Sequence, residues 1–229
     1  NVAVGHAALY TNNGANNVAV GRGSMFANTT GAGNIAVGMN SLDANTTGAS
    51  NTAVGKDALA ANTTGEKNIA VGFQAGLTST TVSANSALGY KALKVNTGAS
   101  NTAVGSEALT ANTTGIENVA VGKGALDANT TGGYSTGVGV NALGSATTGG
   151  QNTALGNSAL GSITTQEGNV GVGNNAGGAI TTGTRNVAMG NNALDATTTA
   201  NDNTAIGFGS LGANTTGTRN TAVGSFAMS

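Results

Sequence analysis

The chain contains no cysteine, no proline and no tryptophan, and only 7% of its 229 residues are charged and 3% aromatic. Ordinary domains are about a quarter charged. The absence of cysteine excludes a disulfide framework and thiolate metal sites. The absence of proline excludes collagen in spite of 39 glycines. A net charge of −1 without a basic cluster argues against binding to nucleic acid or anionic lipid. No apolar run is long enough to span a membrane.

The chain has a short internal repeat instead. The segment Asn-Thr-Ala-Val-Gly at residues 51–55 recurs in close variants along the whole chain, with a spacing of 17 residues in eleven steps and 16 in two. A fixed short period over a whole chain is typical of a solenoid, so residues 1–229 are interpreted as a single repeat domain. The units begin at Asn1, Asn17, Asn34, Asn51, Asn68, Asn85, Asn101, Asn118, Ser135, Asn152, Asn169, Asn186, Asn203 and Asn220.

Each position of the unit, counted from 1 to 17, has a narrow composition. Position 3 is Ala or Gly, position 4 is aliphatic, position 5 is Gly and position 8 is Ala or Ser in all fourteen units. Position 9 is Leu or Met in twelve units, and Gly76 and Gly177 are the exceptions. Positions 13 and 14 are Thr-Thr in the eleven full-length units. All seventeen charged residues lie at positions 6, 7, 10, 16 or 17, so the other positions are kept free of charge, as buried positions are.

The repeat predicts an all-β fold, a parallel β-solenoid (β-roll) of about 14 coils with one unit per coil. Seventeen residues are too few for a helix-turn-helix unit, and Gly at position 5 with Asn, Thr and Gly at 12–15 interrupts any helix. Positions 1–4 predict a strand, since position 2 is often β-branched. Positions 8–11 predict a second, weaker strand, and Gly at 5, and often at 15, permits the tight turns between them.

Strand alternation assigns the positions to two faces. Positions 2 and 4 form an aliphatic face, whereas positions 1 and 3 lie on the other side, where Asn amides at position 1 are expected to form a hydrogen-bonded ladder. We expect the small residues at positions 3 and 8 to face each other across a narrow interior. On this interpretation the aliphatic side chains at 2, 4 and 9 need another surface to bury them, and we expect further copies of the chain to supply it.

The segment Asn118 to Gly122, Asn-Val-Ala-Val-Gly, is followed three residues later by Ala125 and Leu126. This pattern resembles the head repeat of trimeric autotransporter adhesins. The longer form, Asn-Thr-Ala-Val-Gly with Ala-Leu and Ala-Asn-Thr-Thr-Gly, is similar to repeats in phage and bacterial tail-fibre-like proteins. The resemblance covers essentially the whole chain, although the repeat is longer here than in the adhesin heads. It implies a left-handed, homotrimeric β-roll that is extracellular, at a cell or virion surface, and serves adhesion or forms a fibre shaft.

Side chains that could carry out catalysis or hold a metal ion are scarce. His6 is the only histidine, so the sequence predicts neither a nucleophilic triad nor a histidine metal pair. Asp43, Asp127 and Asp195 share position 10 but lie in non-adjacent units. The Gly-Gly-x-Gly-x-Asp pattern of calcium-binding solenoids does not occur. We therefore predict no enzyme activity, no cofactor and no metal site, and the ligand-binding residues stay open.

Three further patterns have plain structural interpretations. Gly171-Val172-Gly173 lies within the period, without the βαβ context of a dinucleotide fingerprint. The seven aromatic residues do not form a stacking stripe, and most are interpreted as surface or end packing. Six Asn-Thr-Thr triplets match the N-glycosylation sequon, but in this repeat they are interpreted as turn residues. They begin at Asn28, Asn45, Asn62, Asn112, Asn129 and Asn214.

These observations predict a non-enzymatic, extracellular structural or adhesive fibre segment, a stiff rod for surface attachment or receptor binding. Its expected partners are copies of itself and a host-cell surface, glycan or matrix ligand, with no nucleic acid and no membrane insertion. One alternative is an ice-binding solenoid in which the Thr columns at 13 and 14 order water, although adjacent residues of a strand point to opposite faces. Another is a filament subunit that stacks end to end through open strand edges.

Overall fold

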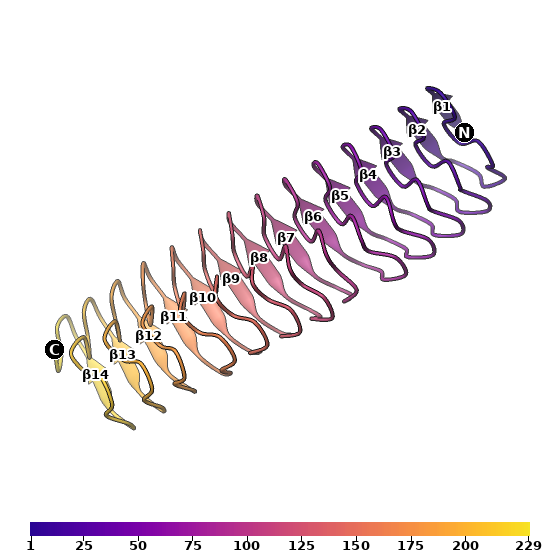
Figure 1. Ribbon diagram of the computed structural model, residues 1–229. Coiled ribbons are helices and arrows are strands. Elements are labelled where there is room, and N and C mark those ends of the chain that lie inside the picture. The colour runs from indigo at the N-terminus through magenta and orange to yellow at the C-terminus, as the bar shows by residue number, and fades with distance from the viewer. The chain divides into compact units, whose positions relative to one another are not determined.

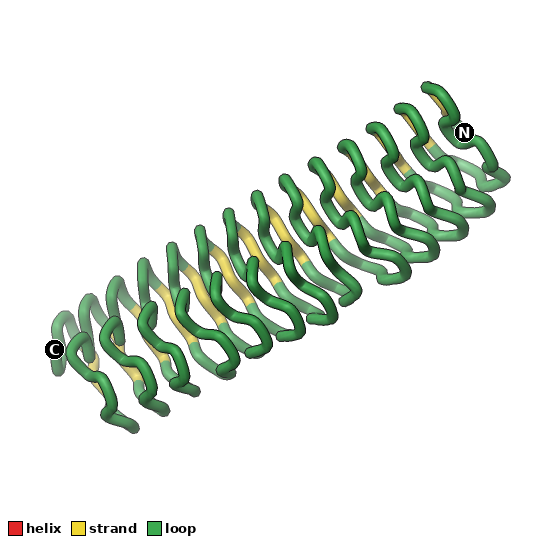
Figure 2. The backbone as a smooth tube through the Cα atoms, in the orientation of Figure 1, coloured by secondary structure: helices red, strands yellow, loops and turns green.

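The computed structural model describes all residues from 1 to 229 and contains strands and turns but no helix (Figure 2). Fourteen strands of three residues occupy positions 2–4 of the fourteen units. This confirms the parallel β-solenoid with one repeat unit per coil. The strands are β1 Val2–Val4, β2 Val18–Val20, β3 Ile35–Val37, β4 Thr52–Val54, β5 Ile69–Val71, β6 Ser86–Leu88, β7 Thr102–Val104, β8 Val119–Val121, β9 Thr136–Val138, β10 Thr153–Leu155, β11 Val170–Val172, β12 Val187–Met189, β13 Thr204–Ile206 and β14 Thr221–Val223.

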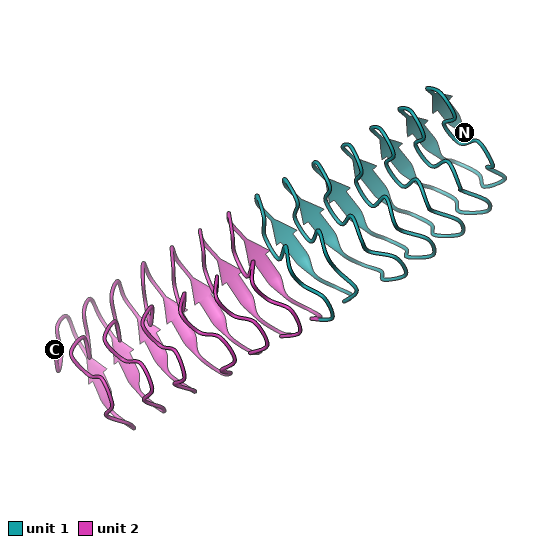
Figure 3. Ribbon diagram, viewed as in Figure 1, with its two compact units in different colours: residues 1–114 teal, residues 115–229 magenta.

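The chain divides into two compact units, unit 1 with residues 1–114 and unit 2 with residues 115–229 (Figure 3). Unit 1 holds β1 to β7 and unit 2 holds β8 to β14. The division falls inside the repeat that begins at Asn101, and the 17-residue period continues across it. Within each unit the strands lie side by side in chain order, so that successive coils stack directly on one another (Figure 1).

Neighbouring coils are related by a shift of one repeat without offset. In unit 1, Ala53 of β4 pairs with Ala36 of β3 and with Ala70 of β5. The same register holds between the strands of unit 2. Because paired strands lie about 4.8 Å apart, each position of the repeat forms a column along the stack. A residue type that is kept at one position therefore forms a row along all the coils of a compact unit.

The interior of a coil is lined by positions 1, 3, 8, 9 and 12. In the fourth coil, Ala53 and Ala58 at positions 3 and 8 are fully buried, which confirms the predicted narrow interior between small residues. Leu59 at position 9 is also buried, with 2% of its surface exposed. The prediction that position 9 needs an external surface is therefore wrong, since this side chain fills its own coil.

The second strand predicted at positions 8–11 is absent, and turns take its place. The main chain is left-handed at positions 7 and 9, with φ of +58° at Asp57 and +48° at Leu59. The N–H of Asp57 donates to the carbonyl of Met39 in the preceding coil (2.9 Å), whereas the N–H of Leu59 donates to Ala75 in the following coil (3.0 Å). This backbone turns two adjacent side chains, at positions 8 and 9, into the interior. A strand cannot do so because its successive side chains point to opposite faces.

Glycine serves two different purposes in the repeat. At position 5 the glycines have φ between +129° and +142°, a conformation that other residues rarely adopt, so the predicted turn is confirmed there. At position 15 the reason is space: a Cβ atom on Gly48 would lie 2.5 Å from the Oδ1 atom of Asn45. The prediction of a conformational need at position 15 is therefore corrected to a steric one.

The asparagines at position 1 form the predicted ladder, but they bond mainly to the main chain, and Asn186 with Asn169 (3.2 Å) is a pair whose amides also bond directly. The Oδ1 atom of Asn34 accepts a hydrogen bond from the N–H of Asn51 (2.9 Å), and its Nδ2 atom donates to the carbonyl of Gly48 (2.8 Å). The side chains of Asn34 and Asn51 are both fully buried. Each such amide therefore joins the start of its unit both to the turn at position 15 of the same unit and to the first residue of the next unit.

A second column of asparagines, at position 12, forms an amide-to-amide ladder that the repeat pattern did not predict. The Nδ2 atom of Asn45 donates to Oδ1 of Asn28 (2.7 Å), and Nδ2 of Asn62 donates to Oδ1 of Asn45 (2.8 Å). The ladder is interrupted where Ser79 takes position 12, and there Oδ1 of Asn62 is buried without a hydrogen-bond partner. In unit 2 the column becomes apolar over three consecutive coils, at Ala146, Ile163 and Ile180.

Candidate functional site

The outer sheet face, defined as the side chains at positions 2 and 4 of each strand, is open to solvent, and it combines Val, Ile, Thr and Ser at position 2 with aliphatic side chains at position 4. Position 4 is aliphatic in every coil. Val37 and Val71 in unit 1 are 36% and 38% exposed, and Leu155 and Met189 in unit 2 are 40% and 41% exposed. Position 3 between them is buried, so the predicted alternation is confirmed. Each unit therefore presents a flat column of aliphatic side chains to its surroundings.

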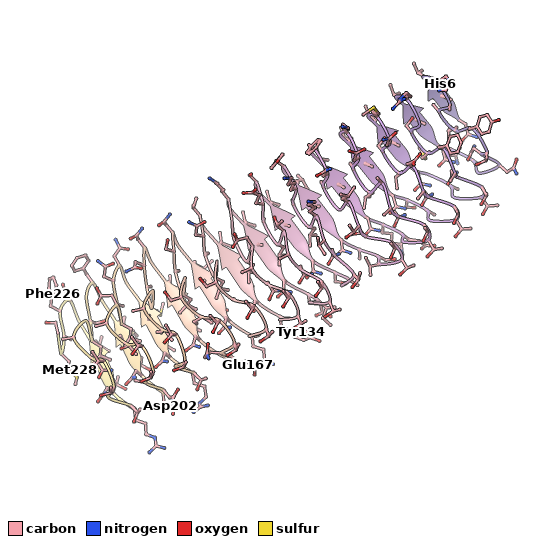
Figure 4. The ribbon with its side chains drawn as sticks, in the orientation of Figure 1. His6, Tyr134, Glu167, Asp202, Phe226 and Met228 are labelled. Carbon is pink, nitrogen blue, oxygen red and sulfur yellow. The ribbon has the colours of Figure 1, made fainter.

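Most of the charged residues lie on the turns at both ends of the strands, at positions 6, 7, 16 and 17, and the others lie at position 10. Figure 4 shows Tyr134, Glu167 and Asp202 pointing away from the coils of unit 2 at positions 16 and 17. There the Nε atom of Arg185 lies 2.6 Å from Oδ1 of Asp202 in the next coil. The hydrogen bond from this guanidinium lowers the pKa of Asp202 below its ordinary value of 3.8. The pair is solvent-exposed, and such pairs contribute little to stability.

The pKa of Asp43 is shifted in the other direction. This residue lies at position 10, on the wall that faces the strands. Partial burial, and next the negative charge of Asp57, raise the pKa of Asp43 above 3.8. The other position-10 carboxylates, Asp127 and Asp195, lie in separate coils of unit 2. His6 is exposed in the turn after β1 (Figure 4). No group of three or more His, Asp or Glu side chains is arranged to hold a metal ion.

A shallow groove of about 410 Å³ crosses the turns of unit 2. Its walls include Asn141, Ser158 and Asn175 at position 7, and its floor is formed by Gly144 and Gly161 at position 10. The lining offers amide and hydroxyl groups, and Asp127 is its one carboxylate. Glycoside hydrolysis uses a pair of carboxyl groups, which this groove does not present. No helix of the protein is long and apolar enough to cross a membrane.

The paired threonines of the turn do not form two parallel columns on one surface. The hydroxyl of Thr46 at position 13 donates to the carbonyl of Thr63 in the next coil (3.1 Å), and Thr147 makes the same bond to Thr164 (3.1 Å). Thr47 at position 14 is exposed. The position-13 hydroxyls are thus engaged by the main chain, which leaves position 14 as the outward threonine column.

The asparagines of the glycosylation sequons belong to the position-12 column inside the coil. Asn28, Asn45, Asn62 and Asn112 are fully buried. Asn45 also donates to the carbonyl of Gly48 in its own turn (3.0 Å). Their interpretation as turn residues is confirmed, and a glycan cannot be attached to these buried amides in the folded coil.

All seven aromatic residues are exposed, which confirms their interpretation as surface residues, and six of them form three pairs between adjacent coils that were not predicted. Tyr10 and Phe26 stack with their centroids 5.2 Å apart, and both occupy position 10. Phe73 and Tyr90 stack at 5.7 Å, and both occupy position 6. A third pair, Phe208 with Phe226, meets edge to face at 5.1 Å. The signal was present in the sequence, because residues at one position of adjacent units become neighbours.

No known protein family matches the chain, and no curated protein sequence matches it significantly.

Proposed function

We propose that this chain is a non-enzymatic structural and adhesive segment of an extracellular fibre, and that its coils assemble with other copies through the outer sheet face. The observation that carries the proposal is the composition of position 4, which is aliphatic in all fourteen coils and yet half-exposed or exposed in almost all of them. An exposed position without a partner tolerates polar residues, whereas contiguous apolar surface usually marks an interface.

The rest of the coil supports a self-assembling segment. Its interior is already filled by positions 3, 8 and 9, so the aliphatic face is not needed to complete the fold of one chain. Every copy presents the same flat face, and closed rotational symmetry allows identical faces to cover one another. We propose three copies, and this number rests only on the resemblance to trimeric adhesin heads. The extracellular location and the role in surface attachment rest on the same resemblance.

Sedimentation of the whole chain and of two valine variants tests the proposal. Val121→Asp places a carboxylate on the outer sheet face, where an interface would bury it without a partner. Val140→Asp makes the same change at position 6, where the side chain is 43% exposed and lies off the sheet face. We expect a trimer for the wild type, the same trimer for Val140→Asp, and loss of assembly for Val121→Asp.

Circular dichroism of the same samples separates a loss of assembly from a loss of fold. A wild-type chain that is a folded monomer at micromolar concentration overturns the proposed assembly. Filaments that lengthen with concentration, in both the wild type and Val121→Asp, indicate end-to-end stacking instead. Thermal hysteresis by the wild type indicates ice binding and also contradicts the proposal.

A further inference from the structure

The turn after each strand carries position 6 on an exposed edge, which begins at His6 in Figure 4. In unit 1 this edge combines cationic, aromatic and thioether side chains in consecutive coils. We define the position-6 edge as Arg22, Met39, Lys56, Phe73, Tyr90 and the neighbouring Lys91.

Most of these side chains contact a neighbour on the edge. The Nη2 atom of Arg22 lies 3.7 Å from the sulfur of Met39. The Nζ atom of Lys56 lies 5.7 Å from the ring centroid of Phe73, and that ring stacks on Tyr90 with an angle of 12° between the planes. Lys91 covers Tyr90, with its Nζ atom 4.7 Å from the ring centroid. The edge therefore consists of two groups of contacting side chains in consecutive coils, Arg22 with Met39 and Lys56 with Phe73, Tyr90 and Lys91.

In this arrangement the rims of the two aromatic rings, which are their positive parts, face the solvent. An aromatic ring is negative on its faces and positive at its rim. Here the faces are covered by the second ring and by the two ammonium groups. Phe73 and Tyr90 are nevertheless 38% and 45% exposed, so their rims stay accessible. Ring rims flanked by ammonium groups attract anions.

Three carboxylates lie near this edge, equal in number to its three cations, so its attraction for anions rests on the greater exposure of the cations. Asp57 is 4.0 Å from Lys56, but its side chain is 18% exposed against 50% for the lysine, and it accepts a hydrogen bond from Asn40 (3.2 Å). Asp43 lies on the wall behind the edge, at position 10, and interacts with Asp57. Glu107, at position 7 of the next coil, interacts with Lys91. The side chain of Lys56 is therefore more accessible to a ligand than that of Asp57.

The cations recur on every second coil: Arg22 in the second, Lys56 in the fourth and Lys91 in the sixth. Two coil spacings amount to about 10 Å. An extended polymer that carries one acidic group about every 10 Å can pair with all three cations at once. The disaccharide repeat of an acidic polysaccharide is of this kind.

We propose that the position-6 edge of unit 1 binds an extended anionic glycan. Carboxylate or sulfate groups of the glycan pair with Arg22, Lys56 and Lys91. The sugar rings lie along Met39 and the rims of the two aromatic residues. The proposal names a ligand class for the adhesive role proposed above and rests on that role.

The same observations argue against single-stranded nucleic acid as the ligand. Such ligands stack their bases on open aromatic faces in a basic groove. The faces of Phe73 and Tyr90 are occupied by each other and by lysines. The chain as a whole has a net charge of −1.

The test measures binding of the whole chain to heparin, hyaluronan, neutral dextran and an oligo-dT strand at moderate salt. We expect binding to heparin or hyaluronan and none to dextran, and the two acidic glycans distinguish sulfate from carboxylate recognition. The double variant Lys56→Gln with Lys91→Gln should weaken binding roughly tenfold. The matched control, Lys67→Gln with Arg219→Gln, removes the same charge at position 17 and should leave binding within about twofold.

Equal losses in the two double variants overturn the proposal, because binding then follows net charge rather than the edge. Tighter binding to oligo-dT than to either glycan assigns the edge to nucleic acid and overturns it as well, and so does a wild-type chain that binds no acidic glycan. Sedimentation of each variant runs in parallel. A trimer that binds no glycan contradicts this inference alone, whereas a monomer that binds glycan contradicts only the proposed assembly.

Discussion

The Cδ2 atom of Leu160 lies 2.8 Å from the position that a Cβ atom on Gly177 would take, and Cδ1 of Ile180 lies 3.0 Å from it. Gly177 is one of two positions at which the repeat loses its interior leucine, and Ile180 replaces an asparagine of the position-12 column. The two departures from the repeat compensate each other, because the isoleucine and the neighbouring leucine occupy the space that the missing side chain leaves.

This relationship predicts that the repeat consensus is destabilising at this site. Gly177→Leu should lower the free energy of unfolding by about 1–3 kcal/mol through overpacking, although Leu is the usual residue at position 9. The double variant Gly177→Leu with Ile180→Ala should be more stable than the single variant, since the second substitution removes the Ile180 side chain that would overlap with the new leucine. Urea unfolding of the three proteins measures this. An increase in stability for the single variant would show that the site is not filled.

Position 3 should be intolerant of size. Ala120 is fully buried, so Ala120→Leu should destabilise the chain by about 1–3 kcal/mol. Lys123→Leu, three residues later on an exposed turn, should change the melting temperature little. Thermal unfolding of both variants compares the two sites directly. Equal melting shifts would place the interior elsewhere.

The position-12 ladder should be essential in unit 1. Asn45→Ala removes the donor to Asn28 (2.7 Å) and to Gly48 (3.0 Å); it leaves the buried Oδ1 atom of Asn28 without this partner, whereas the carbonyl of Gly48 keeps its hydrogen bond from Asn34. We expect a loss of roughly 1–3 kcal/mol in unfolding free energy. Thr47→Ala, on the exposed side of the same turn, is the control and should be close to neutral. Chemical denaturation decides between them, and a stable Asn45→Ala variant would contradict a structural role for the ladder.

Two aspartates should respond to pH in opposite directions. The pKa of Asp202 is lowered by Arg185, so its stabilisation is present above 3.8 and is lost as the pH falls through the lowered value. The pKa of Asp43 is raised by burial, so its ionised form is disfavoured in the folded chain above 3.8. At neutral pH, Asp202→Asn should lower the melting temperature slightly and Asp43→Asn should raise it. Both differences should vanish well below pH 3.8, and shifts of the same sign at neutral pH would contradict the assignment.

The period of the sequence by itself determined the coil, the strand and its two faces. An invariant glycine at position 5, a small residue at position 3 and an aliphatic residue at position 4 recur at fixed spacing. Alternation along a strand then decides which of them face inward, because the β-conformation leaves no other choice. The pairs Tyr10–Phe26 and Phe73–Tyr90 were also open to prediction, since stacking without offset places equal positions next to each other.

Only the tertiary structure decided the main-chain conformation at positions 7 to 12 and which of their side chains point inward. Leu59 points inward because the main chain is left-handed there, a conformation that is uncommon outside glycine. The hydrogen bonds of that conformation run to the preceding coil from Asp57 and to the following coil from Leu59, so they exist only once three coils are stacked. The ladder from Asn28 to Asn62 likewise needs coils in register, because its bonds join residues seventeen apart. A local pattern cannot reveal a conformation that is stabilised only by contacts between coils.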